Sequence, residues 1–369
     1  MRAWPLLGIV IVQSILSLAH WFIYFTWIAF WFPLSPAATL ALRAGLTALS
    51  FSFIVAAMLG FFFSNRAVSL FYALACIWLG LLNFLFWAGC LCWLVALGFR
   101  IAGAAANRPL IGGALFSLAV AAVAYGILNA RRIRVRRIRV TLPGLPEIWR
   151  GRTALMLSDL HLGHINGARF CRKVVDLCAG LRPDIVFLPG DLFDGTKADA
   201  RRLAAPLKEL AVPLGIYFTT GNHDEFGGAE HYLTALRELG IRVLTNEMVV
   251  VDGLRIVGVP YGDSTYPMRM RTTLNALQLD PQQPSILLNH VPNRLPIVEE
   301  AGISLQLSGH THGGQIFPFT WMTRRVFGKF TYGLQRFGKL QVYTSYGAGT
   351  WGPPMRVGTL PEIVLLQFE

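Results

Sequence analysis

The chain has 369 residues, of which 54% are hydrophobic and only 14% are charged, and its formal net charge is +13. Soluble globular domains carry about 25% charged residues, so the composition excludes an ordinary soluble single-domain protein, and the high hydrophobicity excludes a disordered chain. Residues 1–130 contain five arginines and no Asp, Glu or Lys, whereas residues 151–369 hold 21 basic and 19 acidic residues. The excess positive charge therefore lies in and beside an apolar region, not on a basic soluble surface.

Four long apolar stretches follow one another in the first part of the chain. They lie near residues 5–32, 37–63, 68–98 and 109–128. Because a membrane-spanning helix needs about 20 apolar residues, each stretch predicts one transmembrane helix, and residues 1–130 are expected to form an all-α membrane anchor. The first stretch is much longer than the apolar core of a cleaved signal peptide, so we expect it to remain in the protein.

The arginines beside these stretches predict the orientation of the anchor. With four spans, both ends lie on one side of the membrane, and that side carries Arg2, Arg66 and six arginines within residues 131–139. The other side carries only Arg100 and Arg108. Because positively charged flanks stay in the cytoplasm, we expect a multi-pass protein of the inner or plasma membrane whose C-terminal part is cytoplasmic.

Alternating apolar and polar residues begin at residue 131 and predict a basic linker with a first strand over residues 131–150. Short apolar runs then alternate with helical patterns, which is typical of a layered α/β domain with mixed sheets over residues 151–369. The predicted strands are 154–157, 185–188, 216–219, 286–288, 305–307, 341–344 and 363–368, and the predicted helices are 167–181, 199–211, 229–239 and 293–301. Asp252-Gly253 predicts a hairpin turn between strands at 243–251 and 254–259.

Polar, metal-binding types of side chain stand where five of these strands end. The segments are Ser158-Asp159-Leu160-His161, Gly190-Asp191, Gly221-Asn222-His223-Asp224, Asn289-His290 and Gly309-His310-Thr311-His312. Because ligands of α/β sheets bind at the carboxyl ends of strands, we expect these side chains to converge. Carboxylates mixed with imidazoles suit divalent Mn, Fe, Zn or Ni, and there are too many of them for one tetrahedral ion. Two ions about 3.5–4 Å apart, bridged by a carboxylate, fit better and would polarise a phosphoryl group and generate hydroxide at neutral pH.

The same five segments, in this order, resemble the calcineurin-like metallophosphoesterase superfamily over residues 151–369. Residues 158–163, 309–316 and 347–352 are similar to its membrane-associated branch of YkuE- and YaeI-like phosphodiesterases. The resemblance implies a four-layer αββα sandwich with a dinuclear metal centre.

The resemblance also implies a role for each side chain. Seven residues would bind metal: the first ion by Asp159, His161 and His312, the second by Asn222, His290 and His310, and both by the bridging Asp191. His223 would contact the phosphate and protonate the leaving oxygen, and Asp224 would orient His223.

The roles of several residues near these segments stay open between two interpretations. His164 either faces the substrate or lies on a solvated loop, Asp194 is more typical of a loop-supporting residue than of a metal ligand, and Gln315 stands beside the last ligand. The basic and aromatic segment 317–339 is either a membrane-facing cap or a surface loop over the sheet edge.

These observations predict a membrane-anchored, metal-dependent phosphohydrolase, specifically a phosphodiesterase acting on an amphiphilic phosphate ester such as a phospholipid or UDP-diacylglucosamine. Its partners would be the lipid bilayer and this ester, and the near-neutral charge of residues 151–369 argues against nucleic acid. One alternative is an outward-facing cell-envelope phosphodiesterase, which requires the opposite topology. Another is a membrane sensor or transporter regulated by a phosphoesterase-like domain, although spans without acidic residues argue against a transport path.

Overall fold

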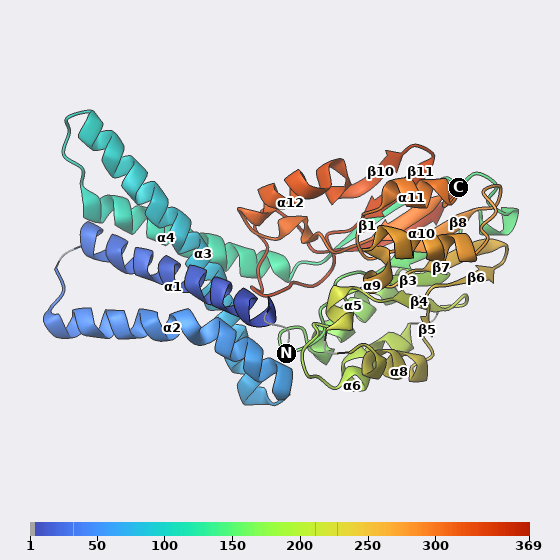
Figure 1. The fold of residues 1–369 in the computed structure, drawn as a ribbon, viewed down its shortest axis with the longest axis horizontal. Coiled ribbons are helices and arrows are strands. Elements are labelled where there is room, and N and C mark those ends of the chain that lie inside the picture. The colour runs from blue at the N-terminus through green and yellow to red at the C-terminus, as the bar shows by residue number, and fades with distance from the viewer. Residues whose placement is uncertain (1–3, 32, 211, 227) are drawn as a thin grey trace. The chain divides into compact units, whose positions relative to one another are not determined.

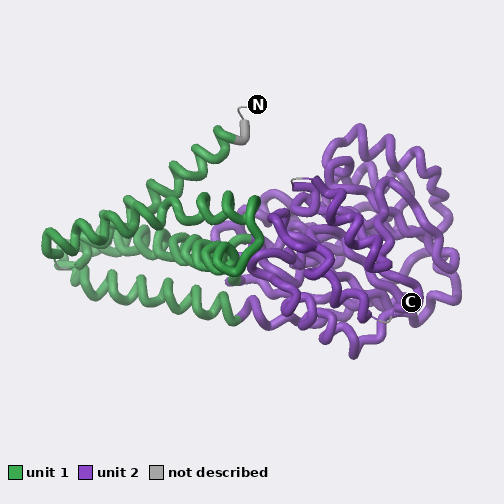
Figure 2. The backbone as a smooth tube through the Cα atoms, turned by 90° about the horizontal axis from the view of Figure 1, so that it is seen from below, with its two compact units in different colours: residues 1–128, 352–355 green, residues 129–351, 356–369 purple. Residues whose placement is uncertain are grey.

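A computed structural model describes residues 4–31, 33–210, 212–226 and 228–369 (Figure 1). The chain forms two compact units, one of residues 1–128 and 352–355 and the other of residues 129–351 and 356–369 (Figure 2). Arg2 and the last residue of the first predicted span lie outside the described residues.

The first unit is helical. Its helices are α1 (Trp4–Phe30), α2 (Pro36–Phe62), α3 (Arg66–Ile101) and α4 (Arg108–Ala130). The side chains of Ser35 and Asn65 cap α2 and α3 by accepting hydrogen bonds from backbone N–H groups, so polar residues in the connections begin these helices. All four helices are long and apolar enough to cross a membrane.

The second unit contains two six-stranded mixed sheets (Figure 1). The first has the order β1 (Arg134–Val140), β12 (Glu362–Phe368), β2 (Thr153–Met156), β3 (Ile185–Pro189), β4 (Ile216–Thr219) and β5 (Arg242–Val243). The second has the order β10 (Gly333–Phe337), β11 (Leu340–Thr344), β9 (Leu305–Ser308), β8 (Ser285–Leu288), β7 (Leu254–Gly258) and β6 (Glu247–Val251). In the first sheet β2 to β5 run parallel, and in the second β7, β8, β9 and β11 do so. The carboxyl ends of β2, β3 and β4 therefore share one edge, as do those of β8 and β9.

Helices cover the outer faces of the two sheets. The α-helices of this unit are α5 (Ala168–Ala179), α6 (Ala200–Ala204), α7 (Asn222–Glu225), α8 (Glu230–Glu238), α9 (Tyr261–Ser264), α10 (Pro267–Ala276), α11 (Leu295–Glu300) and α12 (Phe319–Phe327). Short 3₁₀ turns are η1 (Glu147–Trp149), η2 (Ala205–Glu209), η3 (His312–Gly314) and η4 (Gly328–Thr331).

Alternate residues of a strand face different layers. In β3, Phe187 packs between the sheets, whereas Val186 packs against α5, α6 and α8. In β8, Ile286 packs between the sheets, whereas Leu287 packs against α10 and α11. Because both faces of each sheet are covered, β3 is apolar at every position and β8 at every position after Ser285. The layers are helix, sheet, sheet and helix, and the α/β fold that the sequence predicts is confirmed.

Three predicted elements differ from the structure. The strand predicted at 243–251 is two strands, because the backbone turns at Asn246, whose φ is 55°, and passes from β5 in the first sheet to β6 in the second. The helix predicted at 199–211 ends as α6 and continues as η2, where Pro206 has no backbone N–H to donate; residue 211 lies outside the described residues. The segment 317–339, for which a loop was one alternative, contains α12, η4 and the edge strand β10.

Candidate metal centre

Five strands deliver the candidate ligands. Asp159 and His161 follow β2, Asp191 follows β3, Asn222 and His223 open α7 directly after β4, His290 follows β8, and His310 and His312 follow β9. The first three strands belong to one sheet and the last two to the other. Since the sheets pack face to face, their carboxyl ends bring these side chains together.

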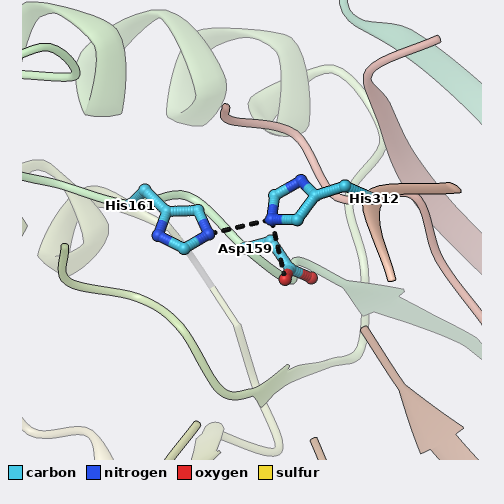
Figure 3. Close-up of side chains that lie close together, drawn as sticks. All are labelled: Asp159, His161 and His312. Atoms are coloured by element: carbon cyan, nitrogen blue, oxygen red, sulfur yellow. Dashed lines mark hydrogen bonds and ion pairs between the residues drawn. The ribbon is translucent and has the colours of Figure 1, made fainter. Parts of the chain in front are cut away.

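Three groups of side chains each gather around one point; one of them consists of His161, Asp194 and His223, and the other two contain the predicted ligands. In the first of these two, His161 Nε2 lies 3.0 Å from His312 Nε2, and His312 Nε2 lies 3.4 Å from Asp159 Oδ1 (Figure 3). In the second, Asp191, His290 and His310 present ligand atoms within 4.8 Å of one another. The amide oxygen of Asn222 joins the second group, because its Oδ1 lies 3.0 Å from His310 Nδ1.

Asp191 connects the two groups. Its Oδ2 atom lies 3.1 Å from His290 Nε2 and 3.7 Å from His161 Nε2, so one carboxylate oxygen faces both sets of imidazoles. Its Oδ1 atom accepts a hydrogen bond of 2.8 Å from the backbone N–H of His223. Asp191 therefore lies between the two groups of candidate ligands.

The site fits divalent metal ions. His290 Nε2 is buried and makes no hydrogen bond with the described residues, although it points at Asp191. His161 and His312 direct ring nitrogens at each other inside a buried site, where they can make at most one hydrogen bond between them. Buried imidazole nitrogens directed at carboxylate oxygens are the donor set expected for Mn, Fe, Zn or Ni.

Electrostatics keeps three of these groups, His310, His312 and Asp191, in the state that binds metal. Burial, followed by the charge of His290, lowers the pKa of His310 to about 3. Burial, followed by the charges of His161 and Arg356, lowers the pKa of His312 well below its usual value. Burial works in the opposite direction on Asp191, but its interaction with His290 keeps the Asp191 pKa below the ordinary range. Although burial opposes it, the charge of Asp191 raises the pKa of His290 to about 9. A metal ion must therefore displace a proton from His290.

Backbone strain is concentrated at these residues. The φ angles are 53° at Asp159, 47° at His161, 51° at Asp191, 69° at His310 and 45° at His312. Left-handed conformations cost about 1–3 kcal/mol each for residues with a Cβ and persist at functional sites where the surrounding structure enforces them. Five strained residues in two small groups therefore mark this as the functional site of the unit.

Two glycines allow the close approach of the strand ends. A Cβ atom on Gly221 would overlap Asp191 Oδ1, and one on Gly309 would overlap Asp159 Oδ2. Glycine is therefore needed at both positions, because carboxylates occupy the space that a side chain would fill.

Neighbouring groups orient the imidazole rings through their Nδ1 atoms. His290 Nδ1 donates to the carbonyl oxygen of Pro189 at 2.9 Å, and Asp194 Oδ1 lies 3.5 Å from His161 Nδ1. Arg356 Nη2 lies 3.1 Å from His312 Nδ1. An acceptor at Nδ1 turns Nε2 towards the centre, as carboxylates and carbonyls do for metal-bound histidines, and this holds for His290 and His161. Arg356 differs, because a guanidinium only donates.

Asp224 is not placed as the sequence predicts. Its carboxylate accepts hydrogen bonds from the backbone N–H groups of Asp191, Gly221 and Phe193, at 2.7, 2.8 and 2.9 Å. His223 instead directs Nδ1 at the carbonyl oxygen of Asp194, at 3.2 Å. Asp224 therefore fixes the turn that carries Asp191, because buried N–H groups need an acceptor there. Burial, followed by the charge of Asp191, raises the pKa of Asp224 to about 7.

His223 lies beside the first group, with its ring 4.8 Å from that of His161. Two exposed aromatic side chains contact the ring of His223: Phe226, with centroids 4.8 Å apart, and Trp351, at 5.6 Å. Their exposed fractions are 45% and 52%. An apolar rim therefore stands next to the residue predicted to face the phosphate.

The structure also places the residues whose roles the sequence leaves open. Asp194 supports His161 and contributes its carbonyl oxygen to His223. Gln315 exchanges two hydrogen bonds with the backbone of Trp351, whereas His164 is half-buried and belongs to none of the candidate ligand groups found among the described residues.

Sequence reasoning missed Arg356, a fully buried arginine. Its guanidinium contacts the His312 ring and donates to the carbonyl oxygens of Tyr346 and Gly349, among others. Nothing in the sequence around residue 356 distinguishes it from a surface arginine, because its importance arises from burial.

Comparisons with known proteins agree with this geometry. Residues 153–314 match the family model of the calcineurin-like phosphoesterases. A Danio rerio protein named "transmembrane protein with metallophosphoesterase domain" is 34% identical and covers 68% of this chain and 60% of its own length. The metallophosphoesterase YkuE of Bacillus subtilis is 28% identical, and the match covers 61% of this chain and 82% of YkuE.

The chain spans 60% of the length of the Danio rerio relative. A metallophosphoesterase of Aquifex aeolicus is 33% identical, and the match covers 68% of this chain and 98% of the relative. With a relative matched along almost its whole length, and with the motif segments gathered at one site, this chain belongs to the calcineurin-like metallophosphoesterase family.

Proposed function

We propose that the protein is a membrane-anchored phosphodiesterase that uses two divalent metal ions on an amphiphilic phosphate ester. The observation that carries this proposal is the position of Asp191 Oδ2, which faces His161 of one ligand group and His290 of the other. When bound, two such ions, of Mn, Fe, Zn or Ni, polarise a phosphoryl oxygen and lower the pKa of water.

The proposal assigns metal binding to seven residues and a positioning role to two others. Asp159, His161 and His312 hold one ion, and Asn222, His290 and His310 hold the other, with Asp191 shared. Asp224 and Asp194 act by holding the backbone and the rings of these residues in place.

His223 is the proton donor in this proposal. Its Nδ1 faces a carbonyl oxygen, which fixes the ring and leaves Nε2 as the nitrogen that meets the substrate. A positioned imidazole gives its proton to the leaving oxygen of the ester and contributes about 10²–10⁴-fold to the rate. The Asp194 carbonyl accepts the proton on Nδ1, so His223 donates from Nε2 as an imidazolium that has taken its second proton from water. The step breaks the Nε2–H bond, forms the O–H bond of the leaving group and returns the ring to its neutral Nδ1–H form. Burial lowers the pKa of His223, so the neutral ring is the favoured form before substrate binds.

An amphiphilic substrate is favoured by two observations. The exposed aromatic side chains of Phe226 and Trp351 provide an apolar contact beside His223. Only three residues, 131–133, separate the end of α4 from the start of β1, and three extended residues span about 10 Å. A catalytic unit held this close to a membrane meets phospholipids or a nucleotide-linked glycolipid such as UDP-diacylglucosamine more often than soluble esters. The positive flanking arginines support a position of this unit on the cytoplasmic side of an inner or plasma membrane.

Purified full-length chain in lipid nanodiscs tests this proposal. Metal content is measured first, and hydrolysis is then followed in Mn²⁺ with bis(p-nitrophenyl) phosphate, p-nitrophenyl phosphate, phosphatidylglycerol and UDP-diacylglucosamine. We expect Asp191→Asn to lower turnover by more than about 100-fold, since loss of a shared ligand costs more than loss of a supporting residue. Asp176→Asn, an exposed position on α5, is the matched control and keeps full activity.

Absence of hydrolysis by the metal-loaded wild type would refute the proposal, as would undiminished activity of Asp191→Asn. A reporter fused to the C-terminus tests the side of the membrane, and an active reporter of the external type would contradict the cytoplasmic placement.

A further inference from the structure

Helix α12 presents its apolar side away from the rest of the unit. Phe319, Met322 and Val326 recur at the spacing of one helix face, and all three are exposed, Val326 by 74%. Trp321 and Phe317 next to this stripe are also exposed. The part of α12 that is less exposed carries Thr320, Thr323 and Phe327.

An ordinary surface helix of the same unit shows the opposite arrangement. In α5, Cys171, Val174, Val175 and Cys178 have the same spacing, and all four are buried against the first sheet. Helix α12 has no buried residue at all. Much of its apolar stripe therefore stays uncovered within the described part of the chain, and such exposed apolar surface marks a contact with something else.

Basic residues border this stripe. Arg324, Arg325 and Lys329 are exposed, and the Arg325 guanidinium lies 5.2 Å from the centre of the Trp321 ring. No Asp or Glu occurs between residues 301 and 361. An amphipathic helix with aromatic residues on one side and arginine or lysine at its border is the pattern of helices that lie in the headgroup region of a bilayer.

The helix is tied to the metal centre at both ends. Its first residues follow the 3₁₀ turn that carries His312, and the backbone N–H of Thr320 donates to Ile316 at 3.2 Å. At its other end, the Phe327 ring lies 6.0 Å from that of His310. The hydroxyl of Thr311, between the two histidines, donates to the Thr331 carbonyl just beyond α12.

We propose that α12 is an interfacial helix that lies in the headgroup layer of the bilayer holding the chain's own apolar helices. The α12 patch consists of Phe319, Trp321, Met322 and Val326, which contact the acyl boundary, and of Arg325 and Lys329, which contact lipid phosphates. We identify the partner of this patch as a bilayer for two reasons. The same chain has four helices able to span a bilayer, and the last of them, α4, ends at Ala130, close in sequence to the start of β1. Because α12 contacts His310 and follows His312, its insertion sets the metal centre at the level of lipid phosphates. This consequence rests on the proposed function, whereas the insertion itself does not.

Spin labelling of the full-length chain in nanodiscs tests the insertion. A nitroxide is attached at Val326→Cys and, as a matched control, at Met268→Cys on α10, whose native side chain is 73% exposed. Both variants are made in a Cys90→Ala background, because the other four cysteines are buried. We expect the label at 326 to collide several-fold less often with water-soluble chromium oxalate, and more often with oxygen, than the label at 268. Equal accessibility at the two positions would overturn the proposal.

The lipid composition provides a second measurement. Each basic residue near an anionic surface increases the partitioning of a protein segment onto that surface by a factor of about five. Nanodiscs of phosphatidylcholine with one-quarter phosphatidylglycerol should therefore protect the label at 326 from chromium oxalate more than nanodiscs of phosphatidylcholine alone. Arg325→Gln with Lys329→Gln should remove this difference. A difference that persists unchanged in this double variant would contradict the contact with lipid phosphates.

Activity separates this inference from the proposed function. We expect the double variant Met322→Ser, Val326→Ser to slow hydrolysis of phosphatidylglycerol or UDP-diacylglucosamine in the nanodisc at least several-fold. The same variant should leave hydrolysis of bis(p-nitrophenyl) phosphate unchanged. The control Met268→Ser should leave hydrolysis of all these substrates unchanged. Equal loss on both substrates would refute the role in presenting lipid phosphates. If the wild type hydrolyses neither, the proposed function fails, and the labels at 326 and 268 still decide whether α12 inserts.

Discussion

Replacing Arg356 with methionine tests whether the buried guanidinium supports the metal centre. The substitution keeps a long unbranched side chain and removes the charge and all donors. In the structure these donors serve His312 Nδ1 and the Thr359 hydroxyl, and the carbonyl oxygens of His312, Tyr346, Gly347 and Gly349.

The expected magnitude follows from these contacts. A buried acceptor left without a donor costs about 1–3 kcal/mol, and the several acceptors here relax together rather than independently. Loss of one partner from a buried charged network typically costs about 3–5 kcal/mol, which is our expected loss in unfolding free energy of the catalytic unit. Because the carbonyl oxygen of His312 also loses its donor, the backbone that carries this ligand is held less firmly, and metal affinity should fall by about 10–100-fold, or about 1.4–2.7 kcal/mol.

The assay is a chelator competition that gives the Mn²⁺ dissociation constant of the full-length chain in nanodiscs, with unfolding followed separately in the apo protein. Arg356→Lys restores the charge but offers a single donor point, so it should recover part of the stability and less of the metal affinity. Arg271→Met, whose guanidinium pairs with Glu300 at the surface, is the matched control and should change stability by less than about 0.5 kcal/mol. An Arg356→Met variant with wild-type metal affinity would refute the supporting role.

Three further predictions concern the same site. Asp194→Asn should weaken Mn²⁺ binding about 10–100-fold in the chelator competition, because it removes the charge that faces His161 Nδ1. Gly309→Ala should lower the unfolding free energy by about 1–3 kcal/mol and reduce metal content measured by elemental analysis, because the new Cβ overlaps Asp159. In isothermal titrations, metal affinity should rise as pH rises towards about 9 and level off above it, because a proton held by His290 below that pKa must leave before metal binds.

Each of these predictions has its own control or contrary result. Asp176→Asn changes a carboxylate on the exposed side of α5 and should leave Mn²⁺ binding unchanged. Gly180→Ala adds a Cβ where nothing lies within 4 Å, so metal content should stay the same. A metal affinity that is independent of pH between 6 and 9 would show that His290 holds no proton in the apo protein.

Much of the site could be predicted from local sequence. The five segments that end in Asp, Asn or His each follow a short apolar run, and a buried parallel strand places whatever follows it at its carboxyl edge. The order of the segments along the chain therefore brought Asp159, Asp191 and His290 into one predicted site without any knowledge of distances. The long apolar stretches before residue 131 were equally clear, because helix length and hydrophobicity are local properties.

Other features depend on contacts between residues far apart in the chain. The structure gives Asp224 a different role from the predicted one, because its carboxylate accepts hydrogen bonds from the backbone N–H groups of Asp191 and Phe193. No rule of sequence spacing associates these residues with Asp224. Arg356 became part of the site only through burial beside His312.

The sequence by itself determined the four long apolar stretches, the alternation of strands and helices and the list of ligand types, because these depend on residue periodicity and on strand ends. Tertiary structure decided which layer each strand joins, as at Asn246, where one predicted strand divides between two sheets. It also decided that the apolar stripe of α12 faces outwards, since the same periodicity in α5 leads to burial. A period fixes which residues share a face, but only the packing of distant elements fixes what that face meets.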